Sequence, residues 1–159
     1  MALLAGLWLN NVVEAHEVDA TPPASQIRST PSAIFKDASA AVDAFHAALS
    51  SGDAKAALGL LADDVQIFEQ GEVERSKTEY GSHHLPSDIE FSRTTESRQT
   101  SRSGAALGDF AYVVSEGTIT GRYKDKDIAM ISIETMVLHH DPLGWRIVHI
   151  HWSSRKAKA

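Results

Sequence analysis

The chain of 159 residues contains no cysteine. It therefore forms no disulfide bond and offers no thiolate to a metal ion. Cysteine usage gives no indication of whether the protein works in an oxidising or a reducing compartment. Basic residues are in the minority, since 15 Lys and Arg stand against 21 Asp and Glu, a formal net charge of −6. Proteins that bind nucleic acids neutralise phosphates with a basic patch. The charge balance argues against a nucleic-acid partner.

Three further absences narrow the chemistry. No serine lies in the glycine-flanked turn that activates a hydrolase nucleophile, because Ser153 and Ser154 simply follow a strand pattern. Gly117 and Gly121 lie inside another strand pattern with no helix after it, so they form no phosphate-binding loop. The apolar stretch Met1–Leu9 is too short to span a bilayer, which predicts no membrane span there.

Residues 1–31 are predicted to be a leader or linker that stands apart from the folded domain. Val13-Glu14-Ala15 is a small-residue pattern typical of signal-peptide cleavage. We therefore expect the remnant of a secretory signal, and a periplasmic or secreted location in preference to the cytoplasm. A disordered or loosely docked leader is the alternative. Prolines at positions 22, 23 and 31 predict a linker before the first helix.

Helices are predicted in the first half of the domain. Ser32 is placed to cap the first helix, whose apolar residues recur at spacings of four, three and four between positions 38 and 49. Asp53 is placed to cap a second, short helix. A third helix is expected over residues 72–84, ended by Pro86.

The second half of the chain has the composition and alternation of strands. A first strand is expected at 65–68, between the helices, and a solvated strand at 91–100. Longer strands at 110–123 and 128–140 precede the final strand, 145–152. This order predicts an α+β fold, with the helices packed on one face of a curved antiparallel sheet.

The final strand carries two histidines within an apolar pattern. Because side chains alternate along a strand, Trp145, Ile147, His149 and His151 are predicted to share one face. A strand that is apolar on both sides is buried on both sides. We therefore expect both imidazoles inside the protein.

Two segments of the chain carry a recognisable order of motifs. The first is Ser51-Gly52-Asp53 opening a helix, followed by Leu61-Ala-Asp-Asp-Val65 leading into a strand. The second is Glu134-Thr-Met-Val-Leu-His-His, a turn, and Gly144-Trp-Arg-Ile-Val-His-Ile-His-Trp-Ser153. Both resemble the nuclear transport factor 2-like superfamily. The second is similar to the final hairpin of the association domain of calcium/calmodulin-dependent protein kinase II and to small bacterial SnoaL-like proteins.

The resemblance implies a cystatin-like fold, in which a cone-shaped sheet wraps about three helices and leaves a pocket at its wide end. It also implies a homodimer through the outer face of the sheet. We assign residues 32–155 to this domain and 156–159 to a basic tail. Members of the superfamily include cyclases, isomerases, dehydratases and oligomerisation hubs, so the fold by itself chooses no activity.

The leading hypothesis is a pocket that binds a small-molecule ligand and needs no cofactor. Trp152, with Tyr112 and Phe68, would wall it, although such aromatics are also common in cores. Residues 83–88 are expected at its rim, where functional loops occur, or else form a helix end that favours histidine. The candidate ligand-binding residues are His83, Asp88, Tyr112, Glu134, His149, His151 and Trp152.

The second hypothesis is an isomerase, cyclase or dehydratase that uses a buried histidine or carboxylate as its base. Alternatively, Glu116 and Glu134 form ordinary cross-strand pairs with Arg122 or Arg146. The Asp and Tyr roles of a ketosteroid isomerase find no aligned positions in this chain. The candidates are His151, Glu134, Glu116 and Asp88, with Tyr80 or Tyr112 as hydrogen-bond donor.

The third hypothesis is a divalent metal site, because histidines at positions i and i+2 of a strand can converge on one ion. The alternative is that these histidines are hydrogen-bonded core residues. A pure oligomerisation module is the fourth hypothesis. The candidate metal ligands are His83, His84, His149 and His151, with a carboxylate from Glu69, Glu74, Glu79 or Asp88.

Overall fold

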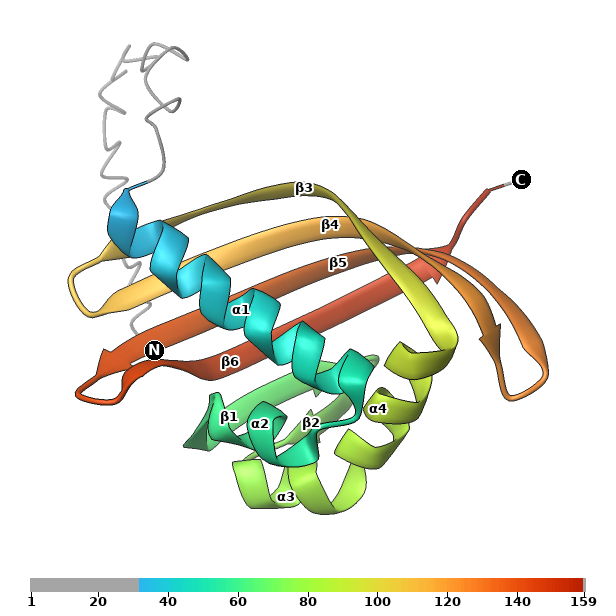
Figure 1. Ribbon diagram of the computed structural model, residues 1–159. Helices are drawn as coiled ribbons and strands as arrows, with labels where there is room; N and C mark the ends of the chain where they lie inside the picture. Colours follow the sequence, from blue (N-terminus) through green and yellow to red (C-terminus); the bar gives the residue numbers. More distant parts are fainter. Residues whose placement is uncertain (1–31, 159) are drawn as a thin grey trace, which may run out of the picture.

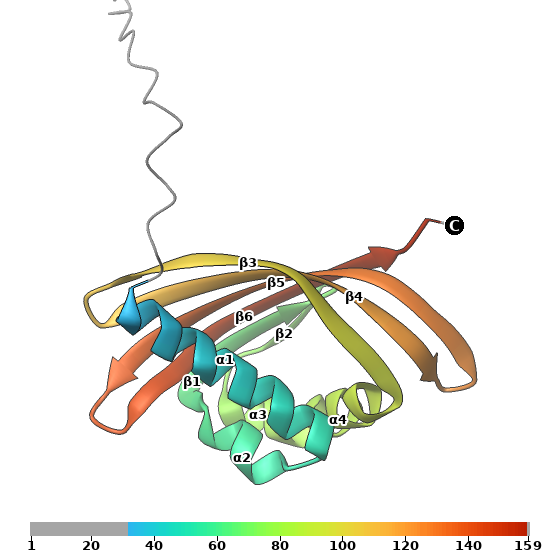
Figure 2. The same ribbon diagram turned by 45° about the horizontal axis from the view of Figure 1, so that its top comes forward.

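The structure of the protein is a computed structural model that describes residues 32–158. The predictions for the leader, residues 1–31, lie outside these residues. A six-stranded curved sheet arches over a layer of helices, which cover its concave face (Figures 1 and 2). None of the described helices is long and apolar enough to cross a membrane.

Helices and short strands occupy the first part of the described chain, and long strands occupy the rest. The predicted α+β fold is therefore confirmed. In chain order the elements are α1 (Ala33–Ser51), α2 (Ala54–Gly59), β1 (Leu61–Glu69), β2 (Glu72–Glu74), α3 (Lys77–His83), α4 (Leu85–Thr94), β3 (Thr95–Leu107), β4 (Phe110–Tyr123), β5 (Lys126–Asp141) and β6 (Gly144–Lys156).

Local signals set the ends of the first two helices as predicted. The Ser32 hydroxyl accepts a hydrogen bond from the Phe35 N–H at 3.1 Å, and Asp53 caps α2 through the Ala56 N–H at 2.9 Å. Gly52 ends α1 with a φ of 82°. Glycine adopts this left-handed conformation without a Cβ clash, so the chain can turn sharply from α1 into α2.

The segment predicted as one helix over 72–84 is divided between a strand and a helix. Glu72–Glu74 forms the edge strand β2, which pairs with the end of β1. α3 begins only at Lys77, where the Ser76 hydroxyl accepts a hydrogen bond from the Glu79 N–H. A strand of three residues is too short to show a period of two, so its helix-like spacing was misleading.

The predicted helix ends at His83, one residue before its expected end, but Pro86 does not end the helical part of the chain, because it belongs to the next helix, α4. It lies in the first turn of α4, where a residue without an N–H loses no intrahelical hydrogen bond. The helix continues to Thr94, and the strand predicted at 91–100 therefore begins at Thr95. The segment 83–88 is thus the junction of two helices.

The last strand of the chain lies in the middle of the sheet. The strand order is β2-β1-β6-β5-β4-β3. All pairs are antiparallel except β1 with β6, which is parallel. β6 therefore joins the short strands near α3 to the long meander of β3, β4 and β5.

β6 contains a bulge. Val137 of β5 pairs with His149, but the next residue, Leu138, pairs with Ile147, so Val148 has no partner on β5. An extra residue in one strand shifts its side-chain alternation by one position. Before the bulge the odd-numbered residues of β6 therefore face the core, and after it the even-numbered residues do.

The bulge overturns the predicted placement of the two histidines. Before it, Trp145 and Ile147 face the helices and are buried, as predicted. After it, the buried position is Ile150, so His149 and His151 point to the convex face of the sheet. The expectation that both imidazoles lie inside the protein is wrong.

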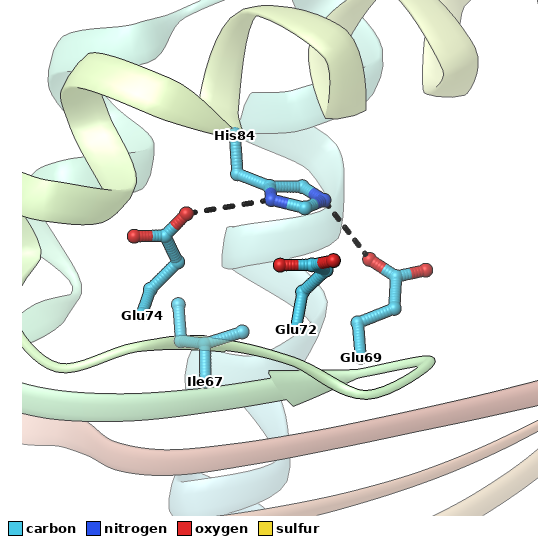
Figure 3. Close-up of a pocket in the computed structure, with 5 residues that line it drawn as sticks. All are labelled: Ile67, Glu69, Glu72, Glu74 and His84. Carbon is cyan, nitrogen blue, oxygen red and sulfur yellow. Dashed lines mark ion pairs between the residues drawn. The ribbon is translucent and has the colours of Figure 1, made fainter.

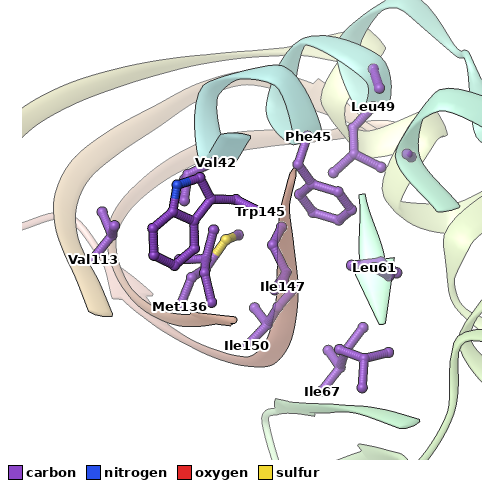
Figure 4. Close-up of a cluster of buried hydrophobic side chains, with 14 of the residues drawn as sticks. Val42, Phe45, Leu49, Leu61, Ile67, Val113, Met136, Trp145, Ile147 and Ile150 are labelled. Carbon is purple, nitrogen blue, oxygen red and sulfur yellow. The ribbon is translucent and has the colours of Figure 1, made fainter. Parts of the chain in front are cut away.

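The core lies between α1 and the concave face of the sheet (Figure 4). Val42 and Phe45, from the predicted stripe of α1, are fully buried. They pack in the same cluster as Met136, Ile147 and Ile150 of the central strands. Each such side chain contributes about 1.5–3 kcal/mol when it is removed from water, which holds α1 against the sheet.

Candidate functional site

A row of mostly polar side chains crosses the concave face from one edge of the sheet to the other. Residues paired directly opposite one another on neighbouring strands point to the same face. The strand registers place six such residues in line, and we call them the polar row. In spatial order they are Arg102, Ser115, Glu134, Trp152, Glu69 and Glu72.

Glu134 is the buried centre of the polar row, with 5% of its surface exposed. Its Oε2 accepts a hydrogen bond from Nε2 of His46 on α1 at 2.8 Å and another from the indole N–H of Trp152 at 2.7 Å. Its Oε1 has no hydrogen-bond partner within residues 32–158. Leaving a buried acceptor unpaired costs about 1–3 kcal/mol, so this oxygen favours any donor that reaches it.

The surroundings of Glu134 keep its carboxyl ionised. Burial by itself would raise the pKa, but the hydrogen bonds from His46 and Trp152 and the electrostatic interactions with His46 and Arg102 lower it below the ordinary value of 4.5. Arg102 is itself held by Asp43 of α1, with Nη1 2.6 Å from Oδ1. A carboxylate, an imidazole and a guanidinium therefore meet beneath α1.

The end of the polar row that lies on β1 and β2 is acidic. His84, between α3 and α4, lies between two carboxylates (Figure 3): its Nε2 is 3.5 Å from Oε2 of Glu69, and its Nδ1 is 3.5 Å from Oε1 of Glu74. These residues, with Ile67 and Glu72, line a cavity of about 10 Å³, which holds about one water molecule. Burial raises the pKa of Glu69 above 4.5, although the charge of His84 opposes this shift.

Asp88 of α4 lies beside this acidic end. The Tyr80 hydroxyl donates a hydrogen bond to Oδ2 of Asp88 at 2.8 Å. Burial raises the pKa of Asp88 to about 6; the hydrogen bond from Tyr80 opposes this shift, and the charge of Glu69 adds to it. Burial and the charge of Asp88 also raise the pKa of Tyr80. Tyr80 therefore keeps its proton and acts as a donor.

Three of the predicted ligand-binding residues point away from the helices. His149 and His151 pack against Phe68 on the convex face, with ring centroids 5.0 and 6.3 Å apart. Tyr112 on the same face is 44% exposed. Because Trp152 points to the concave face, the predicted wall of Phe68, Tyr112 and Trp152 does not form.

The two histidine pairs of the predicted metal site lie on different faces of the sheet. His83 and His84 stand at the end of α3, each facing Glu74. His149 and His151 lie on the convex face. The four imidazoles therefore cannot coordinate one ion, and the core role considered for His149 and His151 fails as well, because both are at least partly exposed.

The remaining predictions for the site concern Glu134, Trp152 and Asp88. Glu134 and Trp152 are direct hydrogen-bond partners, and Asp88 lies with His84 at the acidic end of the polar row. The cross-strand pairs considered for Glu116 and Glu134 do not form: Arg122 and Arg146 face aspartates in or beside the turns next to their strands.

Two residues of the site, His46 and Arg102, have no signal in the sequence. His46 follows a core residue in α1 and resembles any solvent-facing helix position. Arg102 lies in a polar run without apolar alternation. Only the packing of α1 and the register of β3 place them near Glu134.

The sequence and the fold together identify a family. A family model described as a SnoaL-like domain matches residues 38–155. The chain therefore belongs to the SnoaL-like family, with the nuclear transport factor 2-like, cystatin-like fold of its structural neighbours. The predicted resemblance is confirmed. No curated protein matches the chain.

Several solved structures share this fold. A candidate ketosteroid isomerase from Shewanella frigidimarina is 37% identical, with a TM-score of 0.72 over 76% of this chain and 98% of that chain. The calcium/calmodulin-dependent protein kinase II hub of S. rosetta is 21% identical, with a TM-score of 0.65 over 79% of this chain and 100% of that chain. A candidate dehydratase from Streptomyces avermitilis is 19% identical, with a TM-score of 0.64 over 79% of this chain and 96% of that chain. The last two show the fold alone.

The lowered pKa of Glu134 predicts a contribution to stability that is lost in acid. A carboxyl with a lower pKa in the folded state stabilises the fold above its unfolded pKa, taken as 4.5, and loses that contribution as the pH falls through the folded pKa. Near neutral pH, Glu134→Gln should unfold with a free energy about 1–3 kcal/mol below that of the wild type. This gap should narrow below about pH 4.

Urea unfolding of both proteins across this pH range measures the gap. Glu116→Gln, an exposed glutamate on the neighbouring strand, is the matched control and should follow the wild type at every pH. A gap that stays constant or widens in acid would contradict the assignment.

Proposed function

We propose that this protein binds a small organic molecule on the concave face of its sheet, at Glu134 in the centre of the polar row. The observation that carries the proposal is the unequal pairing of the two Glu134 oxygens. Oε2 accepts two hydrogen bonds, whereas Oε1 is buried without one among the described residues. A hydroxyl or ammonium group of a ligand would supply the missing donor, and an ionised acceptor makes such a bond strong.

The surroundings of Glu134 support this site. The side chain of His46 is 43% exposed although that of Glu134 is only 7% exposed, so solvent reaches the imidazole that holds the carboxylate. Phe45 and Trp152 stack beside it with ring centroids 6.3 Å apart. A few polar groups set in an apolar wall are typical of small-molecule sites. A ligand with a donor group attached to an apolar body fits this combination.

A second candidate function, proton-transfer catalysis, is favoured by the geometry of His46. When Nε2 donates to Glu134, the second ring nitrogen, Nδ1, carries the lone pair and can act as a base. A carboxylate that orients an imidazole in this way is a common arrangement for general-base catalysis. The likeness to the candidate ketosteroid isomerase supports a reaction in which a proton moves between two carbons of an unsaturated ketone.

We also propose that the chain forms a homodimer through the convex face of the sheet. Phe110, Tyr112 and Ile133 point outward there and are 53%, 44% and 47% exposed. Gathered apolar side chains on an open sheet face are typical of association surfaces. Two similar solved structures carry the names of a hub and an association domain, which supports self-association.

The binding proposal predicts that the charge of Glu134 matters for affinity. A panel of small alcohols and primary amines is screened against the untagged protein by ligand-observed NMR, and the hits are titrated. Glu134→Gln should weaken the binding of an amine hit by about 10–100-fold, because a hydrogen bond to a charged group is replaced by a neutral one. Glu116→Gln should leave the affinity unchanged. Equal affinity for wild type and Glu134→Gln would overturn the proposal.

The catalytic candidate predicts that the protein isomerises a β,γ-unsaturated ketone to its conjugated isomer, which is followed by ultraviolet absorbance. His46→Gln should slow the reaction by about 100-fold or more, since it removes the base. His149→Gln, on the convex face, should react at the wild-type rate. Absence of activity in the wild type, or equal rates for wild type and His46→Gln, argues for binding without catalysis.

The dimer proposal predicts a solution mass of about twice the 17.2 kDa of one chain. Ile133→Asp should halve the mass measured by light scattering, because it buries a charge in the interface. Leu143→Asp, in the exposed turn between β5 and β6, should not change it. A monomeric wild type would refute the dimer.

A further inference from the structure

We propose that Glu69, His84 and Asp88 form a binding site for one divalent transition-metal ion at the acidic end of the polar row. One nitrogen or oxygen atom from each of the three residues lies within 4.8 Å of the others. The three ligands come from β1, the α3–α4 junction and α4, so a metal ion here would join the sheet to the helices. The proposal does not depend on ligand binding at Glu134.

The spacing of these groups suits a shared ion better than direct hydrogen bonds. Nε2 of His84 and Oε2 of Glu69 are 3.5 Å apart, which is longer than the ~2.7–3.2 Å of an N–H···O hydrogen bond. Two ligands on one tetrahedral ion with bonds of about 2.0–2.2 Å lie about 3.3–3.6 Å apart. The observed separation falls in this second range.

The space available also fits a single ion. The cavity lined by Glu69, Glu72, Glu74, His84 and Ile67 has a volume of about 10 Å³. This is room for roughly one water-sized species, which excludes an organic ligand. Asp88 of α4 is not among the residues that line the cavity, although one of its oxygens lies within 4.8 Å of a ligand atom of Glu69 and of His84.

Neighbouring residues are placed to orient two of the ligands. The second ring nitrogen of His84, Nδ1, is 3.5 Å from Oε1 of Glu74, which must approach more closely to form a hydrogen bond that orients the imidazole. The Tyr80 hydroxyl donates to Oδ2 of Asp88 at 2.8 Å, so Oδ1 is the oxygen left for the ion. Metal-binding histidines and carboxylates are usually held by such partners, a carboxylate behind the imidazole above all.

Glu74 adds a further buried carboxylate at the cavity. It is 8% exposed, it lines the cavity, and its Oε2 has no hydrogen-bond partner among the described residues. Nδ1 of His83, on a side chain that is 67% exposed, lies 3.6 Å from this oxygen. Buried carboxylates that outnumber their cations are costly. A divalent ion in the cavity would balance them.

The donor set indicates the class of metal. One imidazole and two carboxylates, with a position left for water, suit Zn²⁺, Mn²⁺ or Fe²⁺. Ca²⁺ and Mg²⁺ prefer sites made of oxygen alone. Zn²⁺ is therefore the first probe, and Ca²⁺ is the comparison.

The test uses untagged full-length protein that has been treated with a chelator and then titrated with ZnCl₂ by isothermal calorimetry. We expect one Zn²⁺ per chain and much weaker binding of Ca²⁺. His84→Ala and Asp88→Asn should each weaken Zn²⁺ binding by at least about 100-fold, and Tyr80→Phe by about 10-fold, since it removes only the orienting hydrogen bond. His83→Ala is the matched control and should bind Zn²⁺ like the wild type.

Circular dichroism shows whether each variant is folded, and the visible spectrum of the Co²⁺-loaded wild type provides a readout that needs no variant. A nitrogen- and oxygen-coordinated Co²⁺ spectrum that disappears on addition of Zn²⁺ supports the site. No stoichiometric Zn²⁺ binding by the wild type overturns the proposal. Loss of binding in His83→Ala with full binding in His84→Ala also overturns it, and points to the neighbouring group of Glu74, Glu79 and His83.

Discussion

The bulge at Val148 is the constraint on which the concave face depends. β6 lies between β1 and β5, so its side-chain alternation decides what both neighbours meet. Ile147 and Ile150 are three positions apart and both fully buried, which a regular strand with a period of two does not allow. The inserted residue turns Trp152 toward the helices, where its indole reaches Glu134. Without the inserted residue, the side chain of His151 would point to the concave face in place of Trp152.

The polar row shows how position on one sheet can give two glutamates opposite properties. Glu134 and Glu69 lie on the same face, two strands and therefore about 10 Å apart. Burial raises the pKa of both carboxyls, but at Glu134 the donors from His46 and Trp152 outweigh it, whereas at Glu69 the imidazole of His84 does not. The centre of the row thus holds a stable anion that can receive a donor, and one end holds closely spaced acids that favour a cation.

The fold of the family positions these side chains, and this fold is compatible with several activities. Similar folds carry the names of a candidate isomerase, a candidate dehydratase and a kinase hub. A shared fold does not choose among them. The candidate site residues of this chain lie between the sheet and the helices: the pair of His46 and Glu134 beneath α1, and His84 among carboxylates beside α4.

The sequence by itself determined the α+β class, both ends of α1 and the start of α2, the positions of the last three strands and the family, because these follow from local spacing and from matched segments. It also named Glu134, Trp152, Asp88 and His84, since their residue types carry the chemistry. Only the tertiary structure decided which of them meet. The register of strands far apart in the chain, and one bulged residue in β6, sent His149 and His151 to the convex face. Such pairings are set by the burial of the whole core, so no local pattern contains them.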